Sequence, residues 1–261
     1  MPTAAAALRK LRWSVTQRGL LETFRFALLR LGAGHSDKPE VHPFDLRHGV
    51  DTSGLIGGAD LATGHEHDRY NTAYYGMSPS RFAGAIEIWR SLAPPAPTES
   101  YTFLDLGCGK GRAVLMATEL PFREVIGEEI HPGLAGVAGE NLRRWQAAGK
   151  SRSPARIVCG DATETELPAG PCLLYLFNPF ARPVVERLAR RLASRFADRK
   201  GMLDVIYFNP EEAEAFEAEE GFRRMWRGTM AMSEEDAAAD LVASPEDLCE
   251  LYRWVGPGRP G

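Results

Sequence analysis

The sequence lacks the features that mark several classes of protein. It has only four cysteines in 261 residues, and they are scattered without the paired spacing of a zinc site. No apolar run is long enough to span a bilayer, and the alanine-rich start has no secretory core. The formal net charge of -4 argues against a nucleic-acid binder with a large basic footprint. We therefore expect a protein of the reducing cytoplasm that does not bind nucleic acid.

Two common nucleotide-binding motifs are also missing. The dinucleotide motif G-x-G-x-x-G would need a glycine where this chain has Arg112, and no G-x-x-x-x-G-K-[ST] loop is present. The chain does contain the glycine turn Gly107-Cys-Gly-Lys-Gly111, between a predicted strand, Thr102–Asp105, and a predicted helix, Arg112–Leu120. Such a turn lets the backbone lie against a ligand, and the start of the helix offers free N–H groups. The turn therefore predicts a nucleotide-like ligand.

Alternation of strands and helices begins at Tyr101. It predicts an α/β fold with a parallel sheet and helices on both faces. After the first pair, we expect strands over 124–128, 155–159, 172–177 and 202–208, and helices over Pro132–Ala148, Arg182–Phe196 and Pro210–Glu220. Two later strands, within Phe222–Arg227 and Leu248–Val255, suit an antiparallel hairpin. Whether a helix separates these two strands stays open.

Residues 1–97 are predicted to form a mainly helical N-terminal extension, and residues 98–261 the core. A basic helix is expected over Ala4–Leu31. Packing on the core or on a second subunit is favoured for it over contact with a membrane surface. A loop follows, and its His65-Glu-His67-Asp68 is too sparse to predict a metal site. Ser78 and Pro79 are expected to begin a helix that runs to about Leu92.

Acidic residues follow three of the predicted strands. Ligands of open α/β sheets lie at the carboxyl ends of the strands, where this chain has Asp105, the pair Glu128-Glu129, and Asp161. A carboxylate about twenty residues past the first glycine suits the hydroxyls of a ribose. Asp161 could instead cap a turn or a helix. These positions make the carboxyl edge of the sheet the predicted ligand site.

The segment Leu104-Asp-Leu-Gly-Cys-Gly-Lys-Gly-Arg112 resembles motif I of the class I S-adenosylmethionine (SAM) methyltransferases. The resemblance implies a Rossmann-like sheet with an antiparallel last strand. It also implies that Asp105 and the turn hold the methionine and ribose parts of SAM, and that Glu129 holds the ribose hydroxyls. Asp161 and Ala162 would read the adenine. The turn residues implied to contact SAM are Gly107, Cys108, Gly109 and Gly111.

A narrower resemblance is to a largely uncharacterised bacterial group within that class. It rests on Phe44-Asp45, Gly49–Gly54, Phe103–Arg112 and Leu174–Phe180. In that group a tyrosine and a Thr/Ser-Pro pair precede motif I and contact SAM. Tyr74 and Ser78 match these positions, although Met77 stands where a threonine is expected. The tyrosines here could fold over the cofactor or pack between extension and core.

Asn178-Pro-Phe180 resembles the (N/D)-P-P-(Y/F) motif of amino-group methyltransferases, with one proline missing. Asn178 would accept hydrogen bonds from the amine and aim its lone pair at the methyl group, and Phe180 would pack on the nitrogen. In the alternative, Asn-Pro simply begins a helix. The chain repeats the dipeptide at Asn209-Pro210, without the aromatic residue.

The leading hypothesis is therefore a SAM-dependent methyltransferase. It would methylate an amino group on a small molecule or a protein and release S-adenosylhomocysteine (SAH). O- or C-methyl transfer stays open, with His42, His48 or His65 as a general base for O-transfer. A SAM-binding regulator without turnover stays open as well, and so does a homo-oligomer. No metal ion is expected.

Overall fold

The computed structural model describes residues 41–65, 70, 72–240 and 246–257, together with Leu8, Leu11, Arg12 and Val15. The helix predicted over Ala4–Leu31 lies outside the described residues except for those four, each of which is helical. His67 and Asp68 of the sparse histidine cluster also lie outside them.

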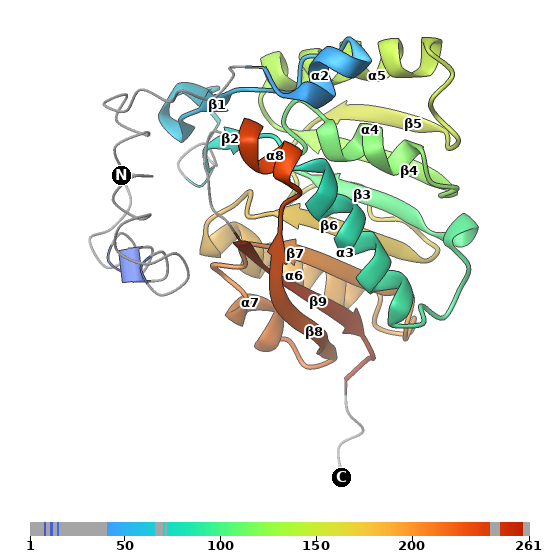
Figure 1. The fold of residues 1–261 in the computed structure, drawn as a ribbon. Coiled ribbons are helices and arrows are strands. Elements are labelled where there is room, and N and C mark those ends of the chain that lie inside the picture. The colour runs from blue at the N-terminus through green and yellow to red at the C-terminus, as the bar shows by residue number, and fades with distance from the viewer. Residues whose placement is uncertain are drawn as a thin grey trace.

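The centre of the molecule is a seven-stranded sheet in the order β5-β4-β3-β6-β7-β9-β8 (Figure 1). The five parallel strands are β3 (Thr102–Leu106), β4 (Glu124–Glu129), β5 (Ala155–Cys159), β6 (Cys172–Phe177) and β7 (Leu203–Phe208). Strand β9 (Glu246–Trp254) pairs antiparallel with both β7 and β8 (Phe222–Ala231). The predicted fold class, a Rossmann-like sheet with an antiparallel end, is confirmed.

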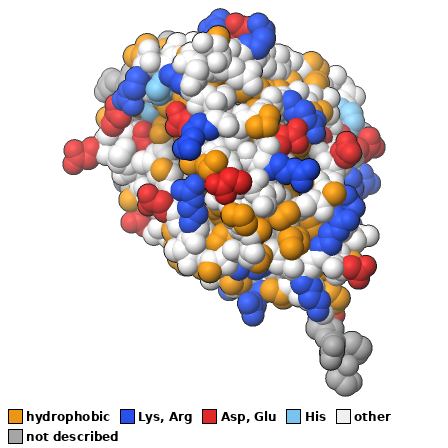
Figure 2. Space-filling model, turned by 90° about the vertical axis from the view of Figure 1, so that its right-hand side faces the viewer, with side chains coloured by type: hydrophobic (Ala, Val, Ile, Leu, Met, Phe, Trp, Pro, Cys, Tyr) orange, Lys and Arg blue, Asp and Glu red, His pale blue; other side chains and the backbone are white. Residues whose placement is uncertain are grey.

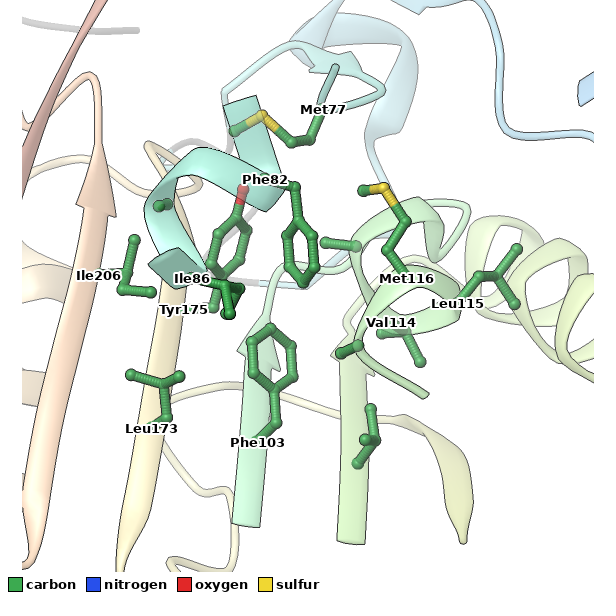
Figure 3. Packing of buried hydrophobic residues seen from close by; sticks show 14 of the residues in the cluster. Met77, Phe82, Ile86, Phe103, Val114, Leu115, Met116, Leu173, Tyr175 and Ile206 are labelled. Atoms are coloured by element: carbon green, nitrogen blue, oxygen red, sulfur yellow. The ribbon is translucent and has the colours of Figure 1, made fainter. Parts of the chain in front are cut away.

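Helices cover both faces of the sheet, so β3 and β7 are buried at every position. Helices α3 (Pro79–Ser91), α4 (Arg112–Thr118) and α5 (Pro132–Ala147) cover one face, and α6 (Arg182–Arg195) and α7 (Glu214–Glu217) the other (Figure 1). Strand alternation sends Phe103 and Tyr175 into the first core, where Figure 3 shows them beside Phe82.

One predicted helix differs from the structure, and the predicted start of another, at Ser78 and Pro79, is confirmed. The helix predicted over Pro210–Glu220 is wrong for most of its length, because only Glu214–Glu217 are helical. Asn209 has a φ of +47°, which turns the chain sharply away from a helical path. Ser78 does precede α3, but its hydroxyl makes no capping bond and is buried without a partner among the described residues.

One question left open by the sequence is answered between the last two strands. Helix α8 (Glu234–Ala239) lies there, and the Ser233 hydroxyl caps it by accepting a hydrogen bond from the Asp236 N–H at 3.2 Å. The Asp236 carboxylate accepts a hydrogen bond from the Ser80 N–H at 2.7 Å. Helix α8 is thus tied to the first turn of α3.

The described part of the N-terminal extension packs beside the carboxyl ends of the strands. It contains α2 (Pro43–His48), β1 (Leu55–Ile56), η1 (Gly58–Leu61) and β2 (Tyr74–Tyr75), with η3 (Thr98–Ser100) leading into β3. The rings of Phe44 in α2 and Trp145 in α5 stack with centroids 5.5 Å apart. Strands β1 and β2 form a short antiparallel ribbon.

The molecular surface mixes charges of both signs on the face drawn in Figure 2, with hydrophobic side chains gathered in its lower part. Among the described residues, no helix has the length and apolar character needed to cross a bilayer.

Candidate functional site

A pocket of about 950 Å³, counting the space open to solvent, lies at the carboxyl ends of the parallel strands. Segments from four strand ends line it, together with β2 and the residues around it. The predicted site residues that line the pocket are Tyr74, Asp105, Gly107, Cys108, Gly109, Glu129, Asp161, Ala162 and Phe180. The predicted site residues Ser78, Gly111 and Asn178 are not part of this lining.

The glycine turn is closely covered by other side chains. A Cβ on Gly109 would lie 2.2 Å from the Tyr74 ring, and one on Gly107 would lie 2.6 Å from Pro179. Both glycines also have positive φ angles, +56° and +77°, which side-chain-bearing residues rarely adopt. No other residue fits at either position without movement.

The N–H groups of the turn are largely used by the chain itself. Those of Gly107 and Cys108 donate to the Glu128 carbonyl at 2.8 and 3.0 Å, and that of Gly109 donates to the Glu129 carboxylate at 2.8 Å. Gly111 lies against helix α5, where a Cβ would be 3.2 Å from Ala138. The N–H groups of Gly107, Cys108 and Gly109 are therefore occupied within the chain.

Asp105 is the most isolated charge in the pocket. Asp105 is 3% exposed and lies in the pocket lining. No described residue donates a hydrogen bond to its carboxylate. Burial, with a smaller effect from the Glu129 carboxylate, raises the pKa of Asp105 well above its ordinary value. A cationic or hydrogen-bond-donating ligand would relieve this unfavourable state.

Glu129 and its neighbour Glu128 are held differently. The carboxylate of Glu129 accepts hydrogen bonds from the N–H groups of Gly109 and His131, at 2.8 and 2.9 Å. That of Glu128 accepts one from the Thr165 hydroxyl. Burial raises the pKa of both residues. The carboxylate of Glu129 is therefore bonded to the glycine turn, whereas Glu128 is bonded to it through its backbone carbonyl.

Asp161 stabilises the turn after β5. One of its carboxylate oxygens accepts a hydrogen bond from the Thr163 N–H at 2.8 Å, and the other lies 3.8 Å from His65 Nε2. The turn-capping interpretation is thus correct for one oxygen. Ala162, which follows it, is buried in the pocket wall.

Asn178 and Asn209 end neighbouring strands in the same way. Phe177 and Phe208 pair across β6 and β7, and the asparagines that follow have φ angles of +44° and +47°. Helix α6 begins only at Arg182, so the interpretation of Asn178-Pro179 as a helix start is wrong. The Asn178 Oδ1 atom is buried and has no hydrogen-bond partner in the part of the chain that the structure describes. Phe180 lies in the pocket wall near Gly107.

Tyr74 connects the glycine turn to the extension. Its hydroxyl donates a hydrogen bond to the Thr52 carbonyl at 2.7 Å while its ring covers Gly109. Burial strongly raises the pKa of the Tyr74 hydroxyl, which therefore stays protonated. Ser78, the other predicted contact from this region, lies beside the pocket and does not line it.

Arg112, which the sequence presents only as a missing glycine, anchors the extension. Its guanidinium is buried and donates to the Thr52 hydroxyl at 2.6 Å and to the Thr52 carbonyl at 3.1 Å. The Asp45 carboxylate lies 3.8 Å from the guanidinium and accepts hydrogen bonds from the Thr52 N–H and the Ser53 hydroxyl, both at 2.6 Å. Phe44-Asp45 and Gly49–Gly54 were noticed only as matching segments.

Glu128, the acid that competes with Glu129 in the sequence, and Tyr75, one of the tyrosines before α3, also line the pocket. Tyr175 and Phe177 line it too, and sequence reasoning missed them. Strand β6 is apolar at nearly every position, so no alternation shows which side chains face the pocket. Among the described residues, no group of three or more His, Cys, Asp and Glu side chains could hold a metal ion.

Comparison with known proteins gives one curated relative, the ribosomal protein L11 methyltransferase of Rhizobium johnstonii. It is 29% identical over 164 residues, which are 63% of this chain and 48% of the relative. This chain thus spans about half the length of that protein. No protein-family model matches the chain. The relative and the strand order confirm the resemblance to class I SAM-dependent methyltransferases.

Two solved structures are similar at a lower level. One is the magnesium protoporphyrin IX methyltransferase of Synechocystis PCC 6803 with bound SAM, with 15% identity, a TM-score of 0.46, and coverage of 67% of this chain and 80% of that chain. The other is a proposed O-methyltransferase of Klebsiella pneumoniae, with 16% identity, a TM-score of 0.46, and coverage of 69% and 81%. At this level of similarity, neither says anything about the substrate of this chain.

Proposed function

We propose that this chain, whose fold is that of the class I SAM-dependent methyltransferases, transfers a methyl group from SAM to an amino group and releases SAH. The observation that carries the proposal is the row of acids at three successive strand ends, Asp105, Glu129 and Asp161, around one pocket.

The pocket suits SAM better than a phosphate-bearing nucleotide. A phosphate needs N–H donors. In the turn, the N–H groups of Gly107, Cys108 and Gly109 already donate to Glu128 and Glu129. SAM carries a cationic amine, two ribose hydroxyls and an adenine amine, which are all donors. Asp105 offers a carboxylate without a donor for the methionine amine. Glu129 would take the ribose hydroxyls, and Asp161 the adenine amine.

Asn178 supports an amine as the methyl acceptor. When bound, SAM supplies a methyl group on a positively charged sulfur, which a neutral lone pair attacks in line. The buried, unpaired Oδ1 of Asn178 can accept an N–H bond and so fix the direction of that lone pair. An amine that is already neutral needs no base before the attack: its lone pair forms the new bond to the methyl carbon, the sulfur keeps the electrons of the broken bond as SAH, and the methylated nitrogen then loses a proton to water. An alkyl ammonium group would first have to lose a proton. Phe180 would pack against the reacting nitrogen.

The identity of the relative makes a protein acceptor one candidate, since its name refers to ribosomal protein L11. A small-molecule amine is the other candidate. A cytoplasmic location, the division of the chain at residues 97 and 98, and any homo-oligomer remain predictions. O-methyl transfer is the alternative, and the His65 Nε2 atom, a candidate general base for it, lies 3.8 Å from the Asp161 carboxylate.

Replacement of Asn178 by glycine tests the proposal. Glycine tolerates the positive φ, so the change removes the amide without straining the backbone. Transfer of radiolabelled methyl from SAM into lysate fractions should fall by about 10²-fold or more, a loss of positioning. SAH affinity, measured by calorimetry, should change little.

The matched control is Asn209→Gly, which makes the same change at the end of the neighbouring strand. Equal loss in both variants would contradict a specific role for Asn178. SAH binding without methyl transfer in any fraction of the wild-type reaction would favour a regulator. No SAH binding would reject the proposal as a whole.

A further inference from the structure

A tyrosine without a hydrogen-bond partner lies under the pocket. Tyr175 is 1% exposed, and its hydroxyl is a buried polar atom with no partner among the described residues. Figure 3 shows this hydroxyl pointing toward the carboxyl ends of the strands, where Met77 lies. A buried hydroxyl without a partner is unfavourable, because its bonds to water are lost and not replaced. Such a group in a pocket wall points to a ligand.

The ring of Tyr175 is held firmly. Its centroid lies 5.8 Å from that of Phe82, 5.7 Å from that of Phe103 and 6.1 Å from that of Phe208. These contacts on three sides leave the hydroxyl little freedom to find another partner. Burial raises the pKa of Tyr175 well above its ordinary value, so the hydroxyl stays neutral and can both donate and accept.

The strand order places this tyrosine next to the residues proposed to bind the cofactor. Asp161 follows β5, Glu129 ends β4 and Asp105 lies near the end of β3, from the edge of the sheet inward. Tyr175 lies on the next strand, β6, directly paired with Asp105. The cofactor would therefore lie across the first three strand ends, and the space over β6 is left for the methyl acceptor.

The wall over β6 is aromatic. Tyr75 and Phe177 contact each other edge to face with centroids 4.8 Å apart, and both line the pocket with Tyr175 and Phe180. The charged residues of the lining are Asp105, Arg112, Glu128, Glu129 and Asp161. The four acids lie at the carboxyl ends of β3, β4 and β5, and Arg112 is bonded to Thr52. None of these charges belongs to β6 or to the segment that follows it.

We propose that Tyr175 binds the methyl acceptor, and that this acceptor has an aromatic body whose one polar, uncharged amine pairs with the Tyr175 hydroxyl. The inference rests on the proposed function, because it takes the acids as the cofactor side. An aromatic ring would pack against the wall that Tyr75 and Phe177 form, and the neutral amine would satisfy the hydroxyl. Tyr175 is thus a specificity-determining residue of the acceptor site.

The test uses the full chain with SAH and two probes observed by fluorine NMR. 4-Fluoroaniline carries a neutral amine at pH 7, and 4-fluorotoluene has a methyl group in its place. The proposal expects 4-fluoroaniline to bind more tightly to the wild-type protein. Tyr175→Phe should weaken the binding of 4-fluoroaniline by roughly three- to tenfold, which is the effect of one hydrogen bond. The affinity for 4-fluorotoluene should not change.

Tyr207→Phe is the matched control, because Tyr207 is also a fully buried strand tyrosine but packs on the opposite face of the sheet, against Phe216. Tyr207→Phe should change the affinity for neither probe. Equal binding of 4-fluoroaniline to wild type and Tyr175→Phe would overturn the inference, as would failure of both probes to bind. A loss of SAH affinity in Tyr175→Phe would assign the residue to the cofactor instead. Failure of SAH to bind the wild-type protein would reject the proposed function itself.

Discussion

The Asp105 carboxyl lowers the stability of the ligand-free fold, although we propose that it binds the cofactor. Its carboxyl is buried without a donor, and its pKa is raised by burial and by Glu129. The folded state therefore holds the proton more tightly than the unfolded state does. From the ordinary carboxyl pKa of 3.8 upward, the unfolded state ionises first, so the contribution of Asp105 to stability falls as the pH rises.

We expect Asp105→Asn to raise the melting temperature of the ligand-free protein at pH 8, because it removes a buried charge without changing the shape of the side chain. The gain should shrink at pH 5, where the wild-type carboxyl is more fully protonated. SAH affinity should fall by about tenfold or more, since a charge-assisted hydrogen bond is lost. Thermal unfolding at both pH values and calorimetry measure the two effects.

Glu124→Gln serves as the control for this prediction. That acid lies at the amino end of β4 in a half-exposed pair with Arg156, so its loss should change stability by less than about 1 kcal/mol. If Asp105→Asn were less stable than the wild type at both pH values, Asp105 would have a favourable partner in the fold.

Single residues also show how far sequence reasoning reaches into the site. Asp105, Glu129 and Asp161 could be predicted because strand ends of a parallel sheet meet at one edge. Ser78 and Gly111 could not be placed, because their local patterns do not reveal which way they face. Tyr175 was missed because a strand buried on both faces has no alternating pattern.

Among the elements, the segment that precedes the core is held by one buried cluster. The cluster consists of Asp45 in α2, Thr52, and Arg112 at the start of α4. The Thr52 carbonyl also accepts a hydrogen bond from the Tyr74 hydroxyl. Through these contacts the position of Tyr74 over Gly109 depends on α2 and α4. We infer that the cluster fixes the position of the Tyr74 ring over the glycine turn.

Asp45→Asn should therefore destabilise the protein by about 2–4 kcal/mol, because the buried Arg112 guanidinium loses its nearby charge and Thr52 loses an acceptor. SAH affinity should fall as well, since Tyr74 is released. Chemical denaturation and calorimetry measure both quantities.

Arg47→Gln is the matched control from the same helix. Arg47 pairs with Glu235 on the surface, where both side chains are more than half exposed, so its loss should cost less than about 1 kcal/mol. A similar cost for both variants would mean that the cluster does not hold the segment.

Element boundaries illustrate the same limit of sequence reasoning. The five parallel strands and α5 were predicted to within one residue, because apolar runs, Pro132 and glycine turns mark them, whereas β8 runs four residues past its predicted end. The helix after Asn209 was wrong because Asn-Pro is as compatible with a left-handed turn as with a helix start. Only contacts with neighbouring strands decide between these two.

At the scale of the whole molecule, the buried carboxyls make stability depend on pH in one direction. Burial raises the pKa values of Asp105, Glu128 and Glu129 together. As for Asp105 alone, raised pKa values in the folded state mean that the unfolded state ionises first. The ligand-free protein should therefore lose stability as the pH rises above the ordinary carboxyl range. A ligand that donates to these carboxylates would favour their ionised forms and offset that loss.

We therefore expect the stabilisation by SAH to grow with pH. At 100 times its Kd, SAH should add about 2.7 kcal/mol, or about 5–10 °C in melting temperature for a domain of this size. This shift should be smaller at pH 5 than at pH 8, because at pH 5 binding must first displace protons from the carboxyls. Melting curves with and without SAH, at fixed multiples of the Kd measured at pH 8, give the comparison. In Asp105→Asn the pH dependence of the shift should be weaker. A shift that is equal at both pH values in the wild type would mean that Asp105 and Glu129 do not bind the ligand, and the proposed site would have to move elsewhere along the strand ends.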